Sequence, residues 1–89
     1  MKKAARNWSL YIIEASDHSY YTGITTDIER RFNQHLDGSG AKFFHGRRPL
    51  AVVYREEGHD RSSASQREAE IKKLTRRKKS DLISRCKIC

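Results

Sequence analysis

The sequence has no apolar run long enough to cross a bilayer, which takes about 20 predominantly apolar residues. The segment Met1-Lys2-Lys3 resembles the beginning of a secretion signal. The apolar run from Leu10 to Ile13 is, however, too short for the hydrophobic part of such a signal. We therefore expect a cytoplasmic protein that has no membrane partner.

Cysteine is scarce, and the only two, Cys86 and Cys89, lie in the last four residues. Their C-x-x-C spacing occurs in redox pairs and in halves of zinc sites. A complete zinc site needs two more ligands, and no His or Cys pair with suitable spacing lies nearby in the sequence. We interpret the pair as part of a reduced terminal tail, since chain ends are usually poorly ordered.

Internal repeats and low-complexity segments are also absent. With 89 residues, of which 36% are hydrophobic and 34% charged, the chain has room for one domain with a thin core. This hydrophobic content is too high for a chain that is disordered throughout. It is low for an adaptor protein, which needs a sizeable exposed apolar patch.

Positive charge is what the sequence has in excess: 19 Lys and Arg against 11 Asp and Glu give a net charge of +8. Nucleic acid is the natural partner, because neutralising its phosphates releases condensed counterions. Charge by itself fits a soluble protein without a partner equally well. The run from Arg76 to Lys79 has a structural explanation, since it ends a predicted helix and complements the helix dipole. The pair Arg47-Arg48 lies in a Gly-rich loop and is the better candidate for a phosphate contact.

Aromatic and β-branched residues predict two strands, at residues 8–14 and 20–25. The polar segment between them, residues 15–19, predicts a hairpin turn. A third strand is expected at residues 50–54. Further helices are expected at about 63–74, after a polar connection at 58–63, and at about 78–84.

The first predicted helix follows Thr26 or Asp27, either of which is a good N-cap. Thr26 would place Glu29 at the third helical position and complete a capping box. Arg31 and His35 are four residues apart and should project from the same side of this helix. The helix should end near Gly38, and its apolar stripe is expected to consist of Ile28, Phe32 and Leu36.

The element order β-β-α-β-α-α predicts an α+β fold, in which a three-stranded antiparallel sheet is flanked by helices. We expect one domain at residues 8–84, with short tails at residues 1–7 and 85–89.

The loop at residues 38–49 interleaves aromatic and basic side chains before Pro49. Exposed aromatics beside cations form stacking platforms for unpaired bases, although at least one of its two phenylalanines should pack into the core. No recognition helix or zinc finger is present to enter a major groove, so single-stranded or structured DNA is the expected partner. The candidate nucleic-acid contacts are Lys42, Phe43, Phe44, His45, Arg47, Arg48 and Lys72.

Two tyrosine-containing triplets lie on the two expected hairpin strands: Ser9-Leu10-Tyr11 and Tyr21-Thr22-Gly23. The helix after them carries Arg31 and His35, and a later helix carries Glu68. In this order and spacing the sequence resembles the GIY-YIG nuclease superfamily, and in particular its small, stand-alone, single-domain bacterial branch.

The resemblance covers about residues 8–84, with some departures. Ser9 replaces the Gly of the first triplet and Thr22 replaces the Ile of the second, while both tyrosines and Gly23, expected as a turn residue, are kept. Some members of the superfamily also carry an Asn near the C-terminus. This chain has no Asn after Asn33, which leaves one wall of the site unassigned.

The resemblance implies a metal-dependent endonuclease that hydrolyses DNA phosphodiester bonds with Mg²⁺, for which Mn²⁺ can substitute, and with no organic cofactor. It implies Tyr11 as general base and Tyr21 as a residue that orients it or contacts the phosphate, with the division of labour between them open. Arg31 would clamp the scissile phosphate, and Glu68 would hold the metal beside the leaving group. His35 would support the site or transfer a proton.

These residue types suit that chemistry. A tyrosine with an ordinary pKa of about 10 accepts a proton from water only where a cation favours the phenolate. The planar fork of an arginine matches phosphate oxygens. Magnesium keeps much of its hydration shell and often uses few protein carboxylates, so one glutamate can suffice beside water and phosphate oxygens.

Each candidate also has a structural alternative. The tyrosines could be packing residues, Arg31 and His35 could lie on a solvated helix face, and Glu68 could form an ion pair with Lys72. The corresponding alternative function is a non-catalytic nucleic-acid-binding module with the same fold. The sequence leaves open DNA or RNA as substrate, and DNA repair or recombination as setting.

Overall fold

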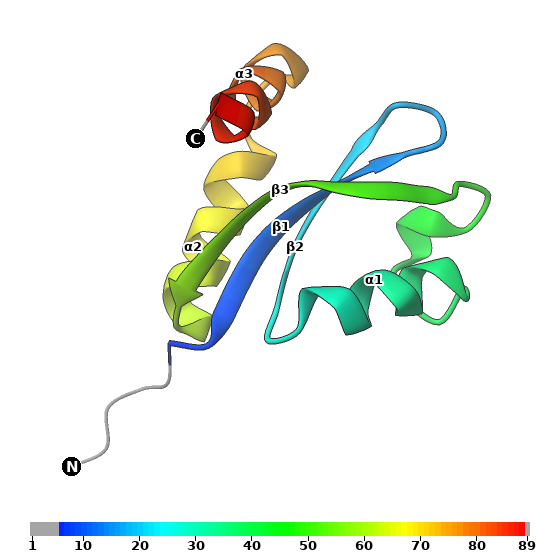
Figure 1. Cartoon of the computed structure of the whole chain (residues 1–89), viewed down its shortest axis with the longest axis horizontal. Helices are drawn as coiled ribbons and strands as arrows, with labels where there is room; N and C mark the ends of the chain where they lie inside the picture. The colour runs from blue at the N-terminus through cyan, green and yellow to red at the C-terminus, as the bar shows by residue number, and fades with distance from the viewer. Residues whose placement is uncertain (1–5, 89) are drawn as a thin grey trace.

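The computed structural model describes residues 6–88, which form a three-stranded antiparallel sheet with helices on both faces (Figure 1). The strands are β1 (Trp8–Ala15), β2 (Tyr20–Thr25) and β3 (Pro49–His59), and their order in the sheet is β2-β1-β3. The central strand therefore pairs with both neighbours, as in Tyr11 opposite Gly23 of β2 and Arg55 of β3. The predicted α+β fold and the hairpin of the first two strands are confirmed.

Strand β3 is longer than the predicted segment at residues 50–54, and the polar connection expected at 58–63 is wrong. The strand continues to His59, which pairs with Trp8, so that only Asp60 separates it from the next helix. The polar residues that end this strand looked like a loop in the sequence. In the structure their side chains find partners on the following helix, which stabilises them in an extended conformation.

The two faces of the sheet are buried by different helices. On one face, Tyr11, Ile13 and Ala15 pack with α1 (Ile28–Leu36) and the 3₁₀ turn η1 (Lys42–Phe44). On the other face, Leu10 and Ile12 pack against α2 (Arg61–Lys72) and α3 (Arg76–Ile88). The alternation of side chains along β1 thus divides a thin core into two layers.

Helix α1 is capped by Asp27, whose carboxylate accepts a hydrogen bond from the Arg30 amide at 3.1 Å. The capping box expected from Thr26 is therefore wrong. The buried stripe also differs from the prediction, since Leu36 is 47% exposed whereas His35 is 2% exposed. The side chain that is buried two turns after Ile28 is that of His35, seven residues later, rather than that of Leu36, eight residues later. The histidine therefore points toward the sheet.

Helix α2 begins two residues earlier than predicted, with Asp60 and Ser63 forming its capping box. Helix α3 extends beyond the predicted segment at residues 78–84 in both directions. The basic run from Arg76 to Lys79 therefore lies at the start of α3, where cations do not complement the helix dipole, and the structural explanation offered for this run is wrong.

Within the described part of the chain, no helix is long and apolar enough to cross a membrane. The first five residues of the predicted N-terminal tail lie outside the described residues. The Cys86–Cys89 pair likewise falls outside the side chains that the structure describes.

Candidate active site

Tyr11 lies at the centre of the candidate site, on the middle strand, and is 1% exposed. Its ring crosses the neighbouring strand at Gly23, where an added Cβ would lie 2.5 Å from the tyrosine oxygen. Gly23 is therefore not a turn residue, as its place in the triplet indicated, but a gap in β2 that accommodates the phenol. Any side chain at that position would displace the Tyr11 hydroxyl.

His35 of α1 lies within hydrogen-bonding distance of this hydroxyl, with 3.1 Å between its Nε2 and the Tyr11 oxygen. Its other ring nitrogen, Nδ1, accepts a hydrogen bond from the Ala41 amide at 3.2 Å. A backbone amide can only donate, so Nδ1 is unprotonated and the proton of the neutral ring is on Nε2. We infer that His35 donates to Tyr11, and that the tyrosine oxygen is the acceptor.

Burial, together with the positive charge of Arg31, lowers the pKa of His35 below its ordinary value. The ring is therefore neutral near pH 7, in agreement with the tautomer that the Ala41 amide imposes. Gly40 lies against the same ring, and a Cβ at Gly40 would overlap His35 Nδ1. The solvated helix face considered for His35 is wrong, because this histidine is a buried part of the site.

Tyr21 of β2 completes an aromatic cluster around the histidine. Its ring centroid lies 5.3 Å from that of His35 and 5.2 Å from those of both Phe43 and Phe44. Phe44 is 5% exposed and belongs to the core, so a base-stacking role for this residue is wrong. The expectation that at least one loop phenylalanine packs into the core is confirmed.

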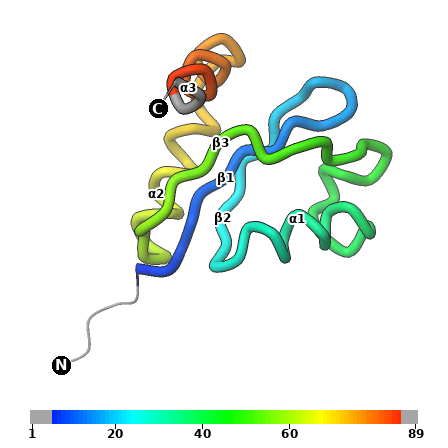
Figure 2. The backbone as a smooth tube through the Cα atoms, in the orientation of Figure 1, coloured from blue at the N-terminus to red at the C-terminus, as the bar shows by residue number. Residues whose placement is uncertain are grey.

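Arg47 holds the loop in place rather than projecting into solvent. Its Nε donates to Asp17 in the hairpin turn at 2.8 Å, and its Nη1 donates to the Phe43 carbonyl at 2.9 Å. The guanidinium also covers the Phe43 ring, 4.3 Å from its centroid. Figure 2 shows the hairpin turn and this loop at the same end of the sheet. Arg47 thus has a structural role, which the sequence did not indicate.

The other basic residues of the loop remain exposed. The side chains of Lys42, His45 and Arg48 face solvent, whereas the backbone of Arg48 is bonded to Ser16. Lys72, on α2, forms an ion pair with Glu68 at 3.2 Å. Of the predicted nucleic-acid contacts, the exposed loop cations are therefore the ones left available for a phosphate.

Arg31 and Glu68 approach the Tyr11 hydroxyl from two different helices. Burial, and then the proximity of Tyr21, raise the pKa of Tyr11 to about 12. Arg31 acts in the opposite direction and Glu68 adds to the increase. His35 is thus within hydrogen-bonding distance of the Tyr11 hydroxyl, and Tyr21, Arg31 and Glu68 lie near enough to influence its pKa, so the structure brings the five residues together from four separate elements.

The guanidinium of Arg31 is oriented by Gln34, whose side-chain oxygen accepts a hydrogen bond from Nη1 at 2.9 Å. Gln34, Gly40 and Ala41 were not predicted as parts of the site. The spacing of Gln34, three residues after Arg31 on a helix, was a usable signal. No comparable signal existed for the loop residues, because their contact with His35 depends on how the loop closes.

Glu68 is the only carboxylate among the five residues, and it is 22% exposed. Within the described residues, no group of three or more His, Cys, Asp or Glu side chains is arranged to hold a metal ion. A single carboxylate does fit Mg²⁺, which retains water and takes substrate oxygens as further ligands. It does not fit a tightly bound structural zinc, which needs four protein ligands.

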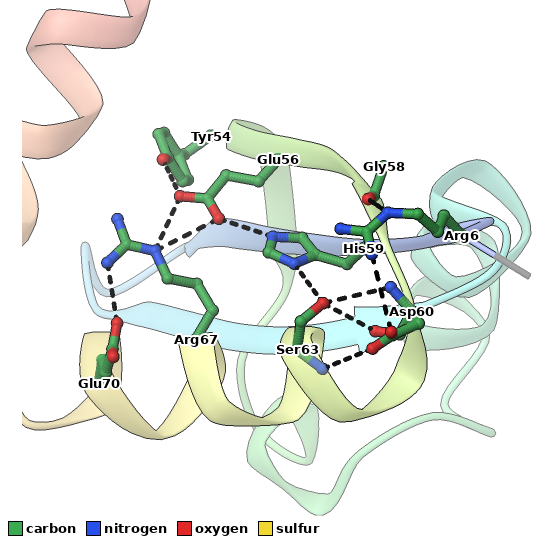
Figure 3. A network of polar contacts seen from close by, with 9 residues as sticks. All are labelled: Arg6, Tyr54, Glu56, Gly58, His59, Asp60, Ser63, Arg67 and Glu70. Atoms are coloured by element: carbon green, nitrogen blue, oxygen red, sulfur yellow. Dashed lines mark hydrogen bonds and ion pairs between the residues drawn. The ribbon is translucent and has the colours of Figure 1, made fainter. Parts of the chain in front are cut away.

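A polar network anchors α2, and with it Glu68, to strand β3 (Figure 3). Arg67 donates through Nε to both carboxylate oxygens of Glu56, at 2.9 and 3.3 Å. The same carboxylate accepts a hydrogen bond from the Tyr54 hydroxyl and lies 3.0 Å from Nε2 of His59. Nδ1 of His59 is in turn 2.9 Å from the Ser63 hydroxyl at the start of α2. This network was not predicted from the sequence, because the third strand was expected to end at Tyr54 and His59 was assigned to a polar connection.

Comparisons with known proteins show the family to which the chain belongs. The sequence matches the GIY-YIG catalytic domain family over residues 7–81. The chain is 46% identical over 77 residues to the UPF0213 protein YhbQ of Escherichia coli K12, covering 86% of this chain and 77% of YhbQ. It is 52% identical over 73 residues to a UPF0213 protein of Haloquadratum walsbyi, covering 82% of each.

Two solution structures have the same fold. The UPF0213 protein BH0048 of Bacillus halodurans has a TM-score of 0.55 and 43% identity, over 86% of this chain and 82% of its own. The protein EF2693 of E. faecalis has a TM-score of 0.63 and 36% identity, over 99% and 91%. The chain belongs to the GIY-YIG family, alongside the small UPF0213 proteins, and Tyr11 and Tyr21 of the candidate site lie on the two strands that carry the triplets for which this nuclease superfamily is named.

Proposed function

We propose that this protein is a metal-dependent endonuclease that hydrolyses DNA phosphodiester bonds, with single-stranded or structured DNA as its substrate. One observation carries the proposal: hydrogen-bond donors and charges from separate elements converge on the buried hydroxyl of Tyr11. A packing tyrosine has no need of a histidine locked in one tautomer, an oriented arginine and a carboxylate. Membership of the GIY-YIG family supports a nuclease activity in general.

In this proposal Tyr11 is the general base that activates the attacking water. With a pKa raised to about 12, the phenol is protonated at neutral pH, so the base requires additional positive charge nearby. The neutral His35 donates to the phenolate oxygen and stabilises it as the proton leaves. Arg31, held by Gln34, presents a planar fork to two oxygens of the scissile phosphate.

Glu68 would hold Mg²⁺, or Mn²⁺, which supplies positive charge to the phosphate and to the leaving oxygen. The negative charge of Glu68 raises the pKa of Tyr11, so neutralising that carboxylate also makes the phenolate easier to form. Lys72 is the present partner of Glu68 and would have to move away from it when the cation binds. Tyr21 packs against the histidine and would orient the site or contact the phosphate.

Cleavage of fluorescent single-stranded, branched and duplex DNA by wild type and Glu68→Gln, with Mg²⁺ or with a chelator, tests the proposal. We expect cutting that requires the metal, favours single-stranded or branched DNA, and falls by at least about 100-fold in the variant. Glu70→Gln is the matched control, because Glu70 lies on the same helix but is exposed and pairs with Arg67. Its rate should stay close to that of wild type.

Two outcomes would contradict the proposal, the first as a whole and the second in its substrate preference. Tight, salt-dependent binding without cutting on every substrate would favour the non-catalytic binding module. Equal or better cleavage of plain duplex would retain the nuclease and reject the preference for unpaired DNA.

A further inference from the structure

A pocket of about 230 Å³ opens beside the candidate active site, at the end of β2 and the start of α1. Arg31 and Gln34 line it, so it shares its wall with the residues that we assign to the scissile phosphate. Trp8 and Arg30 line it as well, and neither has a role in the proposed chemistry. The pocket therefore adjoins the site and shares Arg31 and Gln34 with it.

The aromatic wall of the pocket is Trp8, the only tryptophan in the chain. Its side chain is half-buried, and the guanidinium of Arg61 lies 5.7 Å from the centre of its ring. An indole in contact with both a pocket and a cation offers a flat apolar face with a positive neighbour. A nucleobase stacks on such a face without sequence selection, because every base has a π-face.

The charge of the pocket favours the same kind of ligand. Arg30 is exposed, with no side-chain hydrogen bond or ion pair among the contacts of the described residues. The one carboxylate in the lining, Asp27, is engaged as the N-cap of α1, where it accepts a hydrogen bond from the Arg30 amide. Because Asp27 is already hydrogen-bonded, the positive charges of Arg30 and Arg31 make the opening of the pocket suited to a phosphate of the nucleic-acid backbone.

We propose that this pocket binds the nucleotide next to the scissile phosphate, with its base stacked on Trp8 and its phosphate held by Arg30. The proposal rests on the proposed function, since it takes Arg31 as the clamp for the phosphate that is cut. Stacking on an indole requires a base that is not paired. The pocket would thus select single-stranded or locally opened DNA, independently of the exposed cations in the loop before β3.

Tryptophan fluorescence tests the proposal directly, because Trp8 is the only source of the signal. Wild type is titrated with a short fluorescein-labelled oligothymidine in the presence of chelator, and the anisotropy of the label is followed in parallel. We expect quenching of Trp8 with the same midpoint as the anisotropy change. Binding should weaken about tenfold in Trp8→Ala, since the contribution of base stacking is lost.

Arg30→Ala is the second variant, and it is safe for folding because its side chain is exposed. It should weaken binding and lower the slope of log K against log salt by about 1. Arg77→Ala is the matched control: this arginine is exposed on α3, which packs against the other face of the sheet. It removes the same charge and should affect binding much less than Arg30→Ala does.

Binding seen by anisotropy with unchanged Trp8 fluorescence, or equal effects of Arg30→Ala and Arg77→Ala, would overturn the pocket while leaving the proposed nuclease intact. The reverse case is also distinguishable. Quenching and the expected variant effects, in a protein that cuts no substrate with metal present, would support the pocket in a binding module and overturn the nuclease.

Discussion

Tyr11 and Tyr54 lie on adjacent strands, and the pKa of each is raised to about 12, first of all by burial. Their surroundings are nevertheless opposite in kind. The Tyr54 hydroxyl donates to the carboxylate of Glu56, which further favours its protonated form. The Tyr11 oxygen instead faces the protonated nitrogen of His35 and the guanidinium of Arg31.

This difference shows that a perturbed pKa does not by itself identify a functional tyrosine. Around Tyr54, the carboxylate of Glu56 is matched by Arg67, so the network is electrically satisfied as it stands. Around Tyr11, the donor nitrogens of His35 and Arg31 face an oxygen that carries no charge until it loses its proton, and the nearby carboxylate, Glu68, is the proposed metal ligand. The first arrangement connects β3 to α2, and the second is prepared for a charge that appears only during a reaction.

The largest expected effect is a difference in the rate of DNA cleavage between variants of Tyr11 and Tyr54. Tyr11→Phe should lower the rate of DNA cleavage by about 100- to 10,000-fold, since it removes the proposed general base. Tyr54→Phe should leave that rate within about twofold of wild type, because its hydroxyl serves only the network. Single-turnover cleavage rates measure both, and comparable losses in the two variants would remove the distinction.

A smaller effect is expected on the stability of the protein when the network around Tyr54, rather than the site around Tyr11, is changed. Glu56→Gln removes the negative charge that Arg67 and Tyr54 both contact. We expect the free energy of unfolding to fall by about 1–2 kcal/mol, which is less than for a fully buried ion pair because these side chains are partly exposed. Urea denaturation followed by circular dichroism measures the change. Glu57→Gln, at an exposed carboxylate on the same strand, is the control and should change stability little. A neutral result for Glu56→Gln would mean that the network does not hold α2.

The smallest expected effect concerns the pH dependence of stability. The pKa of His35 is lowered in the folded protein from an ordinary value of about 6.5, so between these two values the unfolded chain binds more protons. The contribution of His35 to stability is therefore complete above about pH 6.5 and declines as the pH falls through that value toward the lowered one. His35→Gln keeps a donor for Tyr11 but does not titrate.

The free energies of unfolding of wild type and His35→Gln, measured from pH 7.5 to 5, check this prediction. The stability of the variant relative to wild type should rise as the pH falls. Subtraction cancels the contributions of His18, His45 and His59, which are common to both proteins. A constant difference across this range would show that His35 titrates equally in both states.

Much of the site could be predicted because its residue types and their order along the chain carry the signal. Tyr11, Tyr21, Arg31, His35 and Glu68 were each assigned through the resemblance to the GIY-YIG superfamily, which rests on the triplets and on the order and spacing of the later residues. The loop was harder, since Phe43, Phe44 and Arg47 form an aromatic and basic pattern that fits exposure as well as burial. Only the packing of Phe44 under the histidine, and the capture of Arg47 by Asp17, distinguish these possibilities.

The sequence by itself determined the strand pattern of the sheet, the overall positive charge and the set of residues that can carry phosphodiester chemistry. These properties depend on local preferences and on composition, which act over short distances along the chain. The tertiary structure decided that Gly23 lies under the Tyr11 phenol and that the Ala41 amide fixes the proton of His35. It also decided that the charged residues at the end of β3 belong to the strand, because Arg67 of α2 pairs with the carboxylate of Glu56 there. Such contacts join residues distant in sequence, and their hydrogen bonds have a direction that only the folded positions of both partners can set.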